Sequence, residues 1–276
     1  MSGSASALKY YFGKELAVRL SEEISVLEPD FPSQHFIQEV QSRVDGLELK
    51  ARVAVIAEQL RRTLPKDYSA AVRLLLKLLG PENESEQGMF TNGYFLMPVA
   101  YFVERYGLDH FELSMHAIYE ITKRHTSEYA IRPYLTAYPQ QSLNKLQQWA
   151  KDDNSHVRRL VSEGTRPRLP WAKRMPVILG DPNIHLSLLD VLLDDSSFYV
   201  RKSVANHLND LSKDYPDITL DWLAARIRPN ENPADSTKTG TGKEKNSLWV
   251  ARHALRTLIK SGDPGASRWL ASVSGE

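Results

Sequence analysis

Three copies of one short pattern decide the fold of this chain: HVRRLVSE at 156–163, YVRKSVAN at 199–206 and WVARHALR at 249–256. Successive copies are 43 residues apart, from Val157 to Val200, and then 50 apart, from Val200 to Val250. A period of about 40 to 47 residues with two helices per unit is typical of HEAT repeats, which stack into a solenoid. The pattern therefore predicts an all-α fold, an α-solenoid of HEAT-like repeats.

The longer second interval contains a segment of different composition. Residues 229–247 are rich in Asn, Pro, Thr, Gly and Lys and show no apolar periodicity. Such composition favours an exposed, flexible loop, whose length accounts for the wider spacing.

Apolar spacing predicts the individual helices. In the second copy, Val200, Val204, Leu208 and Leu211 recur every three or four residues and form one apolar face. Similar spacing predicts helices over 49–64, 70–79, 114–123 and 142–150, and polar residues at 152–155 and 194–197 stand where N-caps belong. We expect a single domain over 1–276, with an N-terminal helical cap and degenerate repeats over 1–110 and clearer repeats over 111–276.

The composition excludes several classes of protein and site. The 276 residues include no Cys, which excludes disulfides, Cys-ligated zinc and iron–sulfur clusters. The eight His residues form no HExxH-type pair, and phosphate-binding and nucleophile-elbow motifs are missing, so we expect neither metal nor cofactor. No long apolar run or secretory signal stands out, and we expect a cytoplasmic protein without membrane contact.

Basic residues recur in register although the net charge is only +1. The aligned positions Arg159, Lys202 and Arg252 predict a basic, concave, DNA-binding face. An alternative stays open, because arginines of HEAT helices also bond neighbouring turns and cap carbonyls. The full set of expected DNA contacts is Arg158, Arg166, Arg168, Lys173, Arg174, Lys202, Asn206, Asn209, Lys213, Arg252 and Arg256.

One carboxylate interrupts this row. Glu163 aligns with Asn206 and Arg256 of the other copies and stands four residues after Arg159. That spacing also suits a simple ion pair on a helix surface. A proline-bracketed basic loop follows and leads to Trp171, which could face DNA or pack in the core. Further upstream, Glu128 could take part in the chemistry or only favour a helix N-terminus.

Several longer strings resemble a known family. They are GLELK at 46–50, YGLDHF at 106–111, IRPY at 131–134, VSEGTRPRLPW at 161–171 and SVANHLND at 203–210. Together they resemble the AlkC branch of bacterial alkylpurine DNA glycosylases, HEAT-like relatives of AlkD, over nearly the whole chain. Some members carry an immunoglobulin-like domain after the repeats, and we expect a short form without it.

The resemblance implies a monofunctional DNA repair glycosylase that removes cationic N3-methylated bases, chiefly 3-methyladenine and 3-methylcytosine, from double-stranded DNA. It implies base excision without drawing the lesion into a pocket, which departs from ordinary base flipping. The matching motifs make Glu128, Arg159, Glu163 and Trp171 the expected catalytic residues. We expect a monomer that acts on alkylated DNA.

The chemistry suits these residue types. An N3-alkylated base is already cationic and leaves as a neutral molecule, so the enzyme need only stabilise an oxocarbenium-like sugar and position a water. Glu163 and Glu128 suit these tasks, Arg159 could orient Glu163, and Trp171 could present its ring face to the cationic sugar. The alternative is a non-catalytic HEAT scaffold that binds nucleic acid or protein.

Overall fold

The computed structural model describes residues 7–87, 89, 91–227 and 242–274, and these residues form helices and no strand. The all-α prediction is confirmed. The chain divides into two compact units, Met1–Tyr134 and Leu135–Glu276, and the boundary falls inside the short helix α7 (Arg132–Ala137). The predicted division near residue 110, between degenerate and clearer repeats, stays a prediction. Within the described residues, no helix has the length and hydropathy to cross a bilayer.

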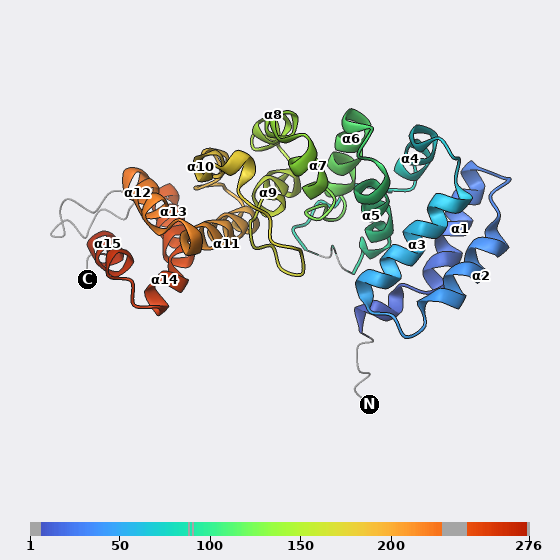
Figure 1. Ribbon diagram of the computed structural model, residues 1–276, viewed down its shortest axis with the longest axis horizontal. Coiled ribbons are helices and arrows are strands. Elements are labelled where there is room, and N and C mark those ends of the chain that lie inside the picture. The colour runs from blue at the N-terminus through green and yellow to red at the C-terminus, as the bar shows by residue number, and fades with distance from the viewer. Residues whose placement is uncertain (1–6, 88, 90, 228–241, 275–276) are drawn as a thin grey trace. The chain divides into compact units, whose positions relative to one another are not determined.

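The first unit packs six α-helices around an apolar core (Figure 1). Helix α3 covers the predicted 49–64 segment and buries Val53, Ile56 and Leu60. Helix α4 begins two residues earlier than the predicted 70 because the Asp67 side chain caps it by accepting from the Ala70 N–H at 2.8 Å. The helices are α1 (Lys14–Leu27), α2 (Ser33–Val44), α3 (Leu49–Thr63), α4 (Tyr68–Leu76), α5 (Met97–Tyr106) and α6 (Phe111–Thr122), with short 3-10 helices at Leu8–Tyr11 and Tyr94–Leu96.

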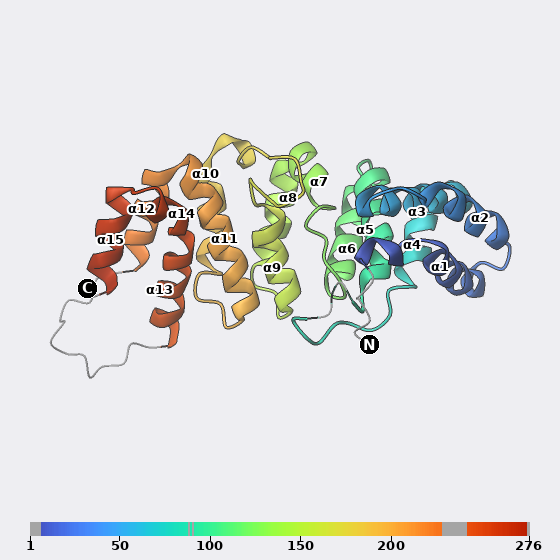
Figure 2. The ribbon, with the colours of Figure 1, turned by 90° about the horizontal axis from the view of Figure 1, so that it is seen from below.

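The second unit contains the motif copies: the first two lie in α9 and α11, and the third begins in α13 and ends at Arg256, the first residue of α14. Figure 2 shows these helices, α9, α11 and α13, side by side, with α8, α10 and α12 behind them. The elements are α8 (Pro139–Trp149), α9 (Ser155–Gly164), a 3-10 turn (Ile178–Gly180), α10 (Pro182–Asp190), α11 (Phe198–Asp214), α12 (Pro216–Arg226), α13 (Gly242–Ala254), α14 (Arg256–Lys260) and α15 (Pro264–Ser274).

The predicted caps of the motif helices are confirmed. The Asn154 side chain accepts from the His156 N–H at 2.9 Å and begins α9. The Ser197 hydroxyl accepts from the Val200 N–H at 3.2 Å and begins α11. Because both caps occupy the same place before the repeated pattern, the two helices start in equivalent register.

The loop predicted over 229–247 is partly wrong. Its first part lies outside the described residues, which resume at 242. From Gly242 onward the chain is helical and belongs to α13. The sequence pattern missed this because 242–247 has polar side chains and little apolar spacing, whereas the helix is continued by the WVARHALR copy that follows.

Candidate active site

Glu163 lies in the last turn of α9, and α11 covers it. One carboxylate oxygen, Oε1, accepts from Arg166 Nη1 at 2.7 Å. The other, Oε2, accepts from the Ser203 hydroxyl at 2.6 Å and lies 3.8 Å from Arg159 Nη2. Only 7% of Glu163 is exposed. The carboxylate is therefore held in one orientation by groups from two helices.

Arg166 connects this carboxylate to a second one. Its Nε donates to Asp210 Oδ2 at 2.9 Å, while its Nη1 is occupied by Glu163. The Nζ of Lys213 lies 3.7 Å from Asp210 Oδ1. Ser203 and Asp210 are seven residues apart on α11 and so share one face of that helix. The result is a buried network in which acidic and basic groups alternate.

The charge of Glu163 follows from these contacts. Burial by itself would raise the pKa of the Glu163 carboxyl, because it removes water from the charged form. The Arg159 and Arg166 guanidinium groups and the Ser203 hydroxyl more than reverse this, and the pKa lies below its ordinary value. Glu163 is thus an anion at neutral pH.

Arg159 lies beside Glu163 and against an aromatic ring. Its guanidinium carbon is 4.7 Å from the centre of the Tyr199 ring, and its side chain keeps 17% of its surface exposed. The ion pair that the i,i+4 spacing suggests is present, as the simpler alternative predicts. Since Glu163 also bonds Arg166 and Ser203, Arg159 is one of several groups that surround the carboxylate.

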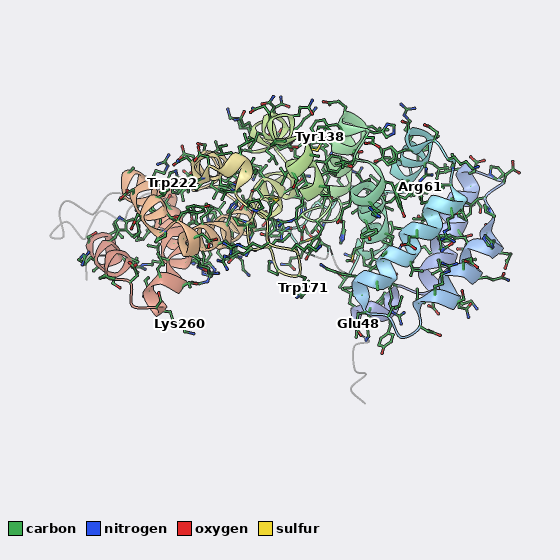
Figure 3. All side chains as sticks on the ribbon, in the orientation of Figure 1. Glu48, Arg61, Tyr138, Trp171, Trp222 and Lys260 are labelled. Carbon is green, nitrogen blue, oxygen red and sulfur yellow. The ribbon has the colours of Figure 1, made fainter. Side chains whose placement is uncertain are left out.

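Trp171 is on the loop that follows α9, and it is not a core residue. It is 80% exposed, and its φ of 60° lies in the left-handed region, which large side chains rarely adopt. In Figure 3, Trp171 and Lys260 lie on the side of the second unit opposite Tyr138. The segment 165–177 contains no helix. Core packing, one of the two alternatives that the sequence left open for Trp171, is wrong.

The base of this loop is fixed. The Met175 N–H donates to the Pro167 carbonyl at 3.0 Å and closes the loop. Arg168 and Arg174 both reach Asp214 of α11, each at 2.7 Å. The loop therefore presents Trp171 from an anchored frame, and backbone strain at such a position is common in functional loops.

Three residues of the expected DNA-binding set are engaged inside the protein. Arg158 pairs with Asp195 at 2.7 Å and donates to the carbonyls of Asp152 and Asp153. Arg166 is buried between carboxylates, and Asn209 is buried against Thr257 with a 2.8 Å hydrogen bond. The expectation that these three face DNA is corrected: Arg158 has the carbonyl-capping role that the HEAT alternative predicts.

The remaining members of that set keep exposed or partly exposed side chains. Asn206 accepts from Arg256 Nη2 at 3.0 Å, so these two belong to the contact between α11 and the start of α14. The exposed members are Lys173, Arg174, Lys202, Lys213, Arg252 and Arg256, and Arg168 is partly exposed. Among them, Lys202 and Arg252 preserve the register that the sequence predicts on neighbouring helices.

Glu128 belongs to the first unit and lies in the turn between α6 and α7. It is buried, and α7 begins only at Arg132, so Glu128 does not stand in the first turn of a helix. The helix-terminus alternative for Glu128 is therefore wrong, and its catalytic role stays a prediction. Among the described residues, no His, Asp or Glu group has the arrangement of a metal site.

Ser203 and Asp210 belong to the site, although the sequence patterns did not predict them. Both lie in the SVANHLND string, on the border of the apolar face formed by Val200, Val204 and Leu208. A usable signal was present: polar residues at positions i, i+4 and i+7 of a largely apolar helix face, here Ser203, His207 and Asp210.

Comparisons with known proteins place the chain in a family. A family model described as DNA alkylation repair enzyme matches residues 46–258. The chain is 36% identical over 262 residues to the uncharacterized protein YhaZ of Bacillus subtilis (strain 168). This match covers 94% of the chain and 66% of YhaZ. It thus spans just under two thirds of the length of that relative.

Two solved structures are similar to different degrees. Pseudomonas fluorescens alkylpurine DNA glycosylase AlkC, bound to DNA that contains an abasic site analog, matches with a TM-score of 0.80 and 36% identity. That match covers 97% of this chain and 69% of AlkC. AlkD2 from Streptococcus mutans matches with a TM-score of 0.38 and 20% identity over 88% of this chain and 97% of AlkD2, too low to support an argument.

Proposed function

The chain belongs to the DNA alkylation repair enzyme family, and from that premise we propose that it is a monofunctional DNA glycosylase for cationic N3-alkylated bases. The likeness to AlkC supports the proposal, since that enzyme was solved with DNA containing an abasic site analog. An abasic site is the product that glycosidic hydrolysis leaves. The expected substrates are 3-methyladenine and 3-methylcytosine in double-stranded DNA, excised without a base-binding pocket.

The observation that carries the proposal is the ionised, immobilised carboxylate of Glu163. Departure of an N3-alkylated base leaves a sugar with oxocarbenium character, which a fixed anion stabilises without reorganisation. The lowered pKa keeps Glu163 charged, and contacts with Arg166 and Ser203 fix its orientation. A carboxylate with two occupied oxygens still has free lone pairs for a water or a cation.

The other expected residues have complementary roles. Arg159, whose guanidinium lies 3.8 Å from Glu163 and whose side chain is 17% exposed, would orient the carboxylate and contact a phosphate. Trp171, exposed on its anchored loop, would lie against the sugar and favour its positive charge through the ring face. Glu128 would share the task of positioning water. Lys202 and Arg252 would contact DNA phosphates, which predicts affinity that falls steeply with salt.

A scaffold without catalysis is the second candidate, and one observation favours it. Both oxygens of Glu163 are bonded within the protein, as in a purely structural ion pair. A scaffold would bind DNA with no preference for a lesion or for a cationic abasic-site mimic. An enzyme would bind the mimic more tightly at every salt concentration.

The test is release of free base from DNA with a single 3-methyladenine or 3-methylcytosine. We expect release by the wild type without strand cleavage, and a decrease of about 100-fold or more in single-turnover rate for Glu163→Gln, because the fixed anion is lost. Asp190→Asn is the matched control, since Asp190 is an exposed acid of α10 that pairs with Arg226.

Two results would contradict the proposal. Undiminished release by Glu163→Gln would remove Glu163 from the mechanism. No release of either base by the wild type would leave the scaffold as the better account.

A further inference from the structure

Two fully buried histidines form a hydrogen-bonded chain next to Glu163. His185 of α10 and His207 of α11 are both 0% exposed, and their rings lie 5.1 Å apart in an edge-to-face arrangement. The Ile178 N–H donates to His185 Nε2 at 2.9 Å. His185 Nδ1 is 3.0 Å from His207 Nε2, and His207 Nδ1 is 2.9 Å from the Ser162 carbonyl.

The two ends of the chain fix every proton in it. A peptide N–H can only donate, so His185 Nε2 must be the acceptor and Nδ1 must carry the proton. That Nδ1–H donates to His207 Nε2, which leaves the proton of His207 on Nδ1, where it donates to Ser162. Both rings are therefore neutral Nδ1–H tautomers, and all four ring nitrogens are satisfied.

Burial supports this protonation state. It lowers the pKa of His185 to about 4, although the nearby Asp181 carboxylate acts in the opposite direction. Each Nε2 already accepts a hydrogen bond, from the Ile178 N–H or from His185 Nδ1–H. A proton added to either Nε2 would point at that donor and break the hydrogen bond. The chain thus has one arrangement over the whole neutral range.

The hydrogen-bonded histidines connect Ser162 with Ile178, and both of these residues are next to parts of the candidate site. Ser162 immediately precedes Glu163, and its carbonyl lies in the last turn of α9, where carbonyls lack intrahelical N–H partners. The Thr165 hydroxyl also donates to this carbonyl, at 3.3 Å. Ile178 immediately follows the 165–177 loop that presents Trp171. His207 lies on the same α11 face as Ser203 and Asp210, which hold the Glu163 carboxylate and Arg166.

We propose that His185 and His207 are positioning residues, which hold the end of α9 and the far end of the 165–177 loop at a fixed separation. Glu163 and Trp171 thereby keep their relative placement although neither contacts a histidine in the chain. This inference rests on the proposed glycosylase function for its effect on rate. The structural part of it stands on the hydrogen bonds and is testable without activity.

The first experiment measures the tautomers directly. In protein labelled with nitrogen-15, long-range imidazole spectra of His185 and His207 should show a protonated Nδ1 and an unprotonated Nε2 from pH 8 down to pH 6. An Nε2–H tautomer at either residue, or protonation of His185 near its ordinary pKa, would contradict the proposed hydrogen-bond arrangement of the two histidines.

The second experiment separates positioning from stability. His207→Asn places an amide donor near the former Nδ1 but provides no acceptor for His185, whereas His207→Leu removes both contacts. We expect single-turnover base release to fall about 100-fold in His207→Leu and less in His207→Asn, with affinity for DNA containing an abasic-site analogue within about twofold of wild type. Leu186→Ala, a buried change one residue from His185, provides a destabilised control.

Amide hydrogen exchange supplies a readout apart from catalysis. The Met175 N–H closes the loop by donating to Pro167, and its exchange should accelerate at least about tenfold in both His207 variants relative to Leu186→Ala. The positioning role would be overturned if the His207 variants exchanged the Met175 amide no faster, and released base no more slowly, than Leu186→Ala. If the wild type releases no base, the proposed function fails, and the tautomers and Met175 exchange still decide whether the histidines fix the loop.

Discussion

Helix α11 makes two different interfaces with its neighbours. Toward α9 it presents Ser203, His207 and Asp210, and the contacts are charged: Glu163, Arg166 and Asp210 are all buried and paired. Toward α13 and α14 it presents Asn206 and Asn209, and the contacts run through neutral amides to Arg256 and Thr257. The same helix therefore supports a charged interface on one side and an amide interface on the other.

The difference shows where the repeat has been specialised. A buried ion pair rarely stabilises a fold more than apolar packing would, because both charges lose their hydration. The amide interface shows that a repeat can be joined without buried charge. The α9–α11 interface contains two buried carboxylates and one buried guanidinium at the point where Glu163 replaces the Asn206 and Arg256 of the other copies. We infer that the charge serves the proposed reaction and not the stacking.

The largest expected effect comes from removing the shared cation. Arg166→Ala leaves Glu163 and Asp210 as neighbouring buried anions, and we expect a loss of about 3 to 5 kcal/mol in the free energy of unfolding. Urea denaturation at pH 7 measures it. Arg168→Ala is the control, because that partly exposed pair with Asp214 should contribute about 1 kcal/mol or less. If both variants lost the same free energy of unfolding, the buried network would stabilise the fold no more than the surface pair does.

A smaller effect is expected at the amide interface. Asn209→Ala leaves the Thr257 hydroxyl without its buried partner and should cost about 1 to 2 kcal/mol. Thr257→Val should cost a similar amount, and the double variant should lose less than the sum of both, since the two changes remove one interaction. If the double variant lost the full sum of the two single losses in the free energy of unfolding, the hydrogen bond between Asn209 and Thr257 would not contribute to stability.

The smallest expected effect is a pH dependence of the charged interface. Because the folded pKa of Glu163 is lower than its unfolded value, its contribution is complete well above about pH 4.3, the ordinary glutamate pKa, and is lost as pH falls through the folded pKa. The stability difference between wild type and Glu163→Gln should therefore be constant from pH 6 to 8 and shrink toward pH 3. Unfolding by urea at each pH measures this difference. A difference that grows on acidification would contradict a lowered pKa of Glu163 in the folded protein.

Much of the fold could be predicted from local spacing. The recurrence of Val157, Val200 and Val250 located the motif helices, and the polar residues before two of them located Asn154 and Ser197 as caps. The start of α13 was missed because Gly242 begins a polar turn that only the later apolar residues continue as a helix. Local patterns succeed where neighbouring residues along the chain determine the backbone.

The candidate site was predictable only in part. Spacing brought Arg159 and Glu163 together, since residues four apart share a helix face. It also grouped Arg158 and Arg166 with the expected DNA contacts, although α9 and the loop after it direct both toward internal carboxylates. A count of basic residues does not distinguish a guanidinium that caps carbonyls from one that faces solvent.

The amino-acid sequence predicted an all-α repeat fold, the helices in which the three motif copies begin, and a carboxylate at the position where the other copies have an amide and a cation. These are properties of periodicity and alignment, which depend on neighbours in the chain. The partners of that carboxylate and the exposure of Trp171 depend on tertiary contacts. Ser203 is 40 residues from Glu163, and Asp210 is 44 residues from Arg166, so stacking of α11 on α9 creates those contacts and no local pattern specifies them.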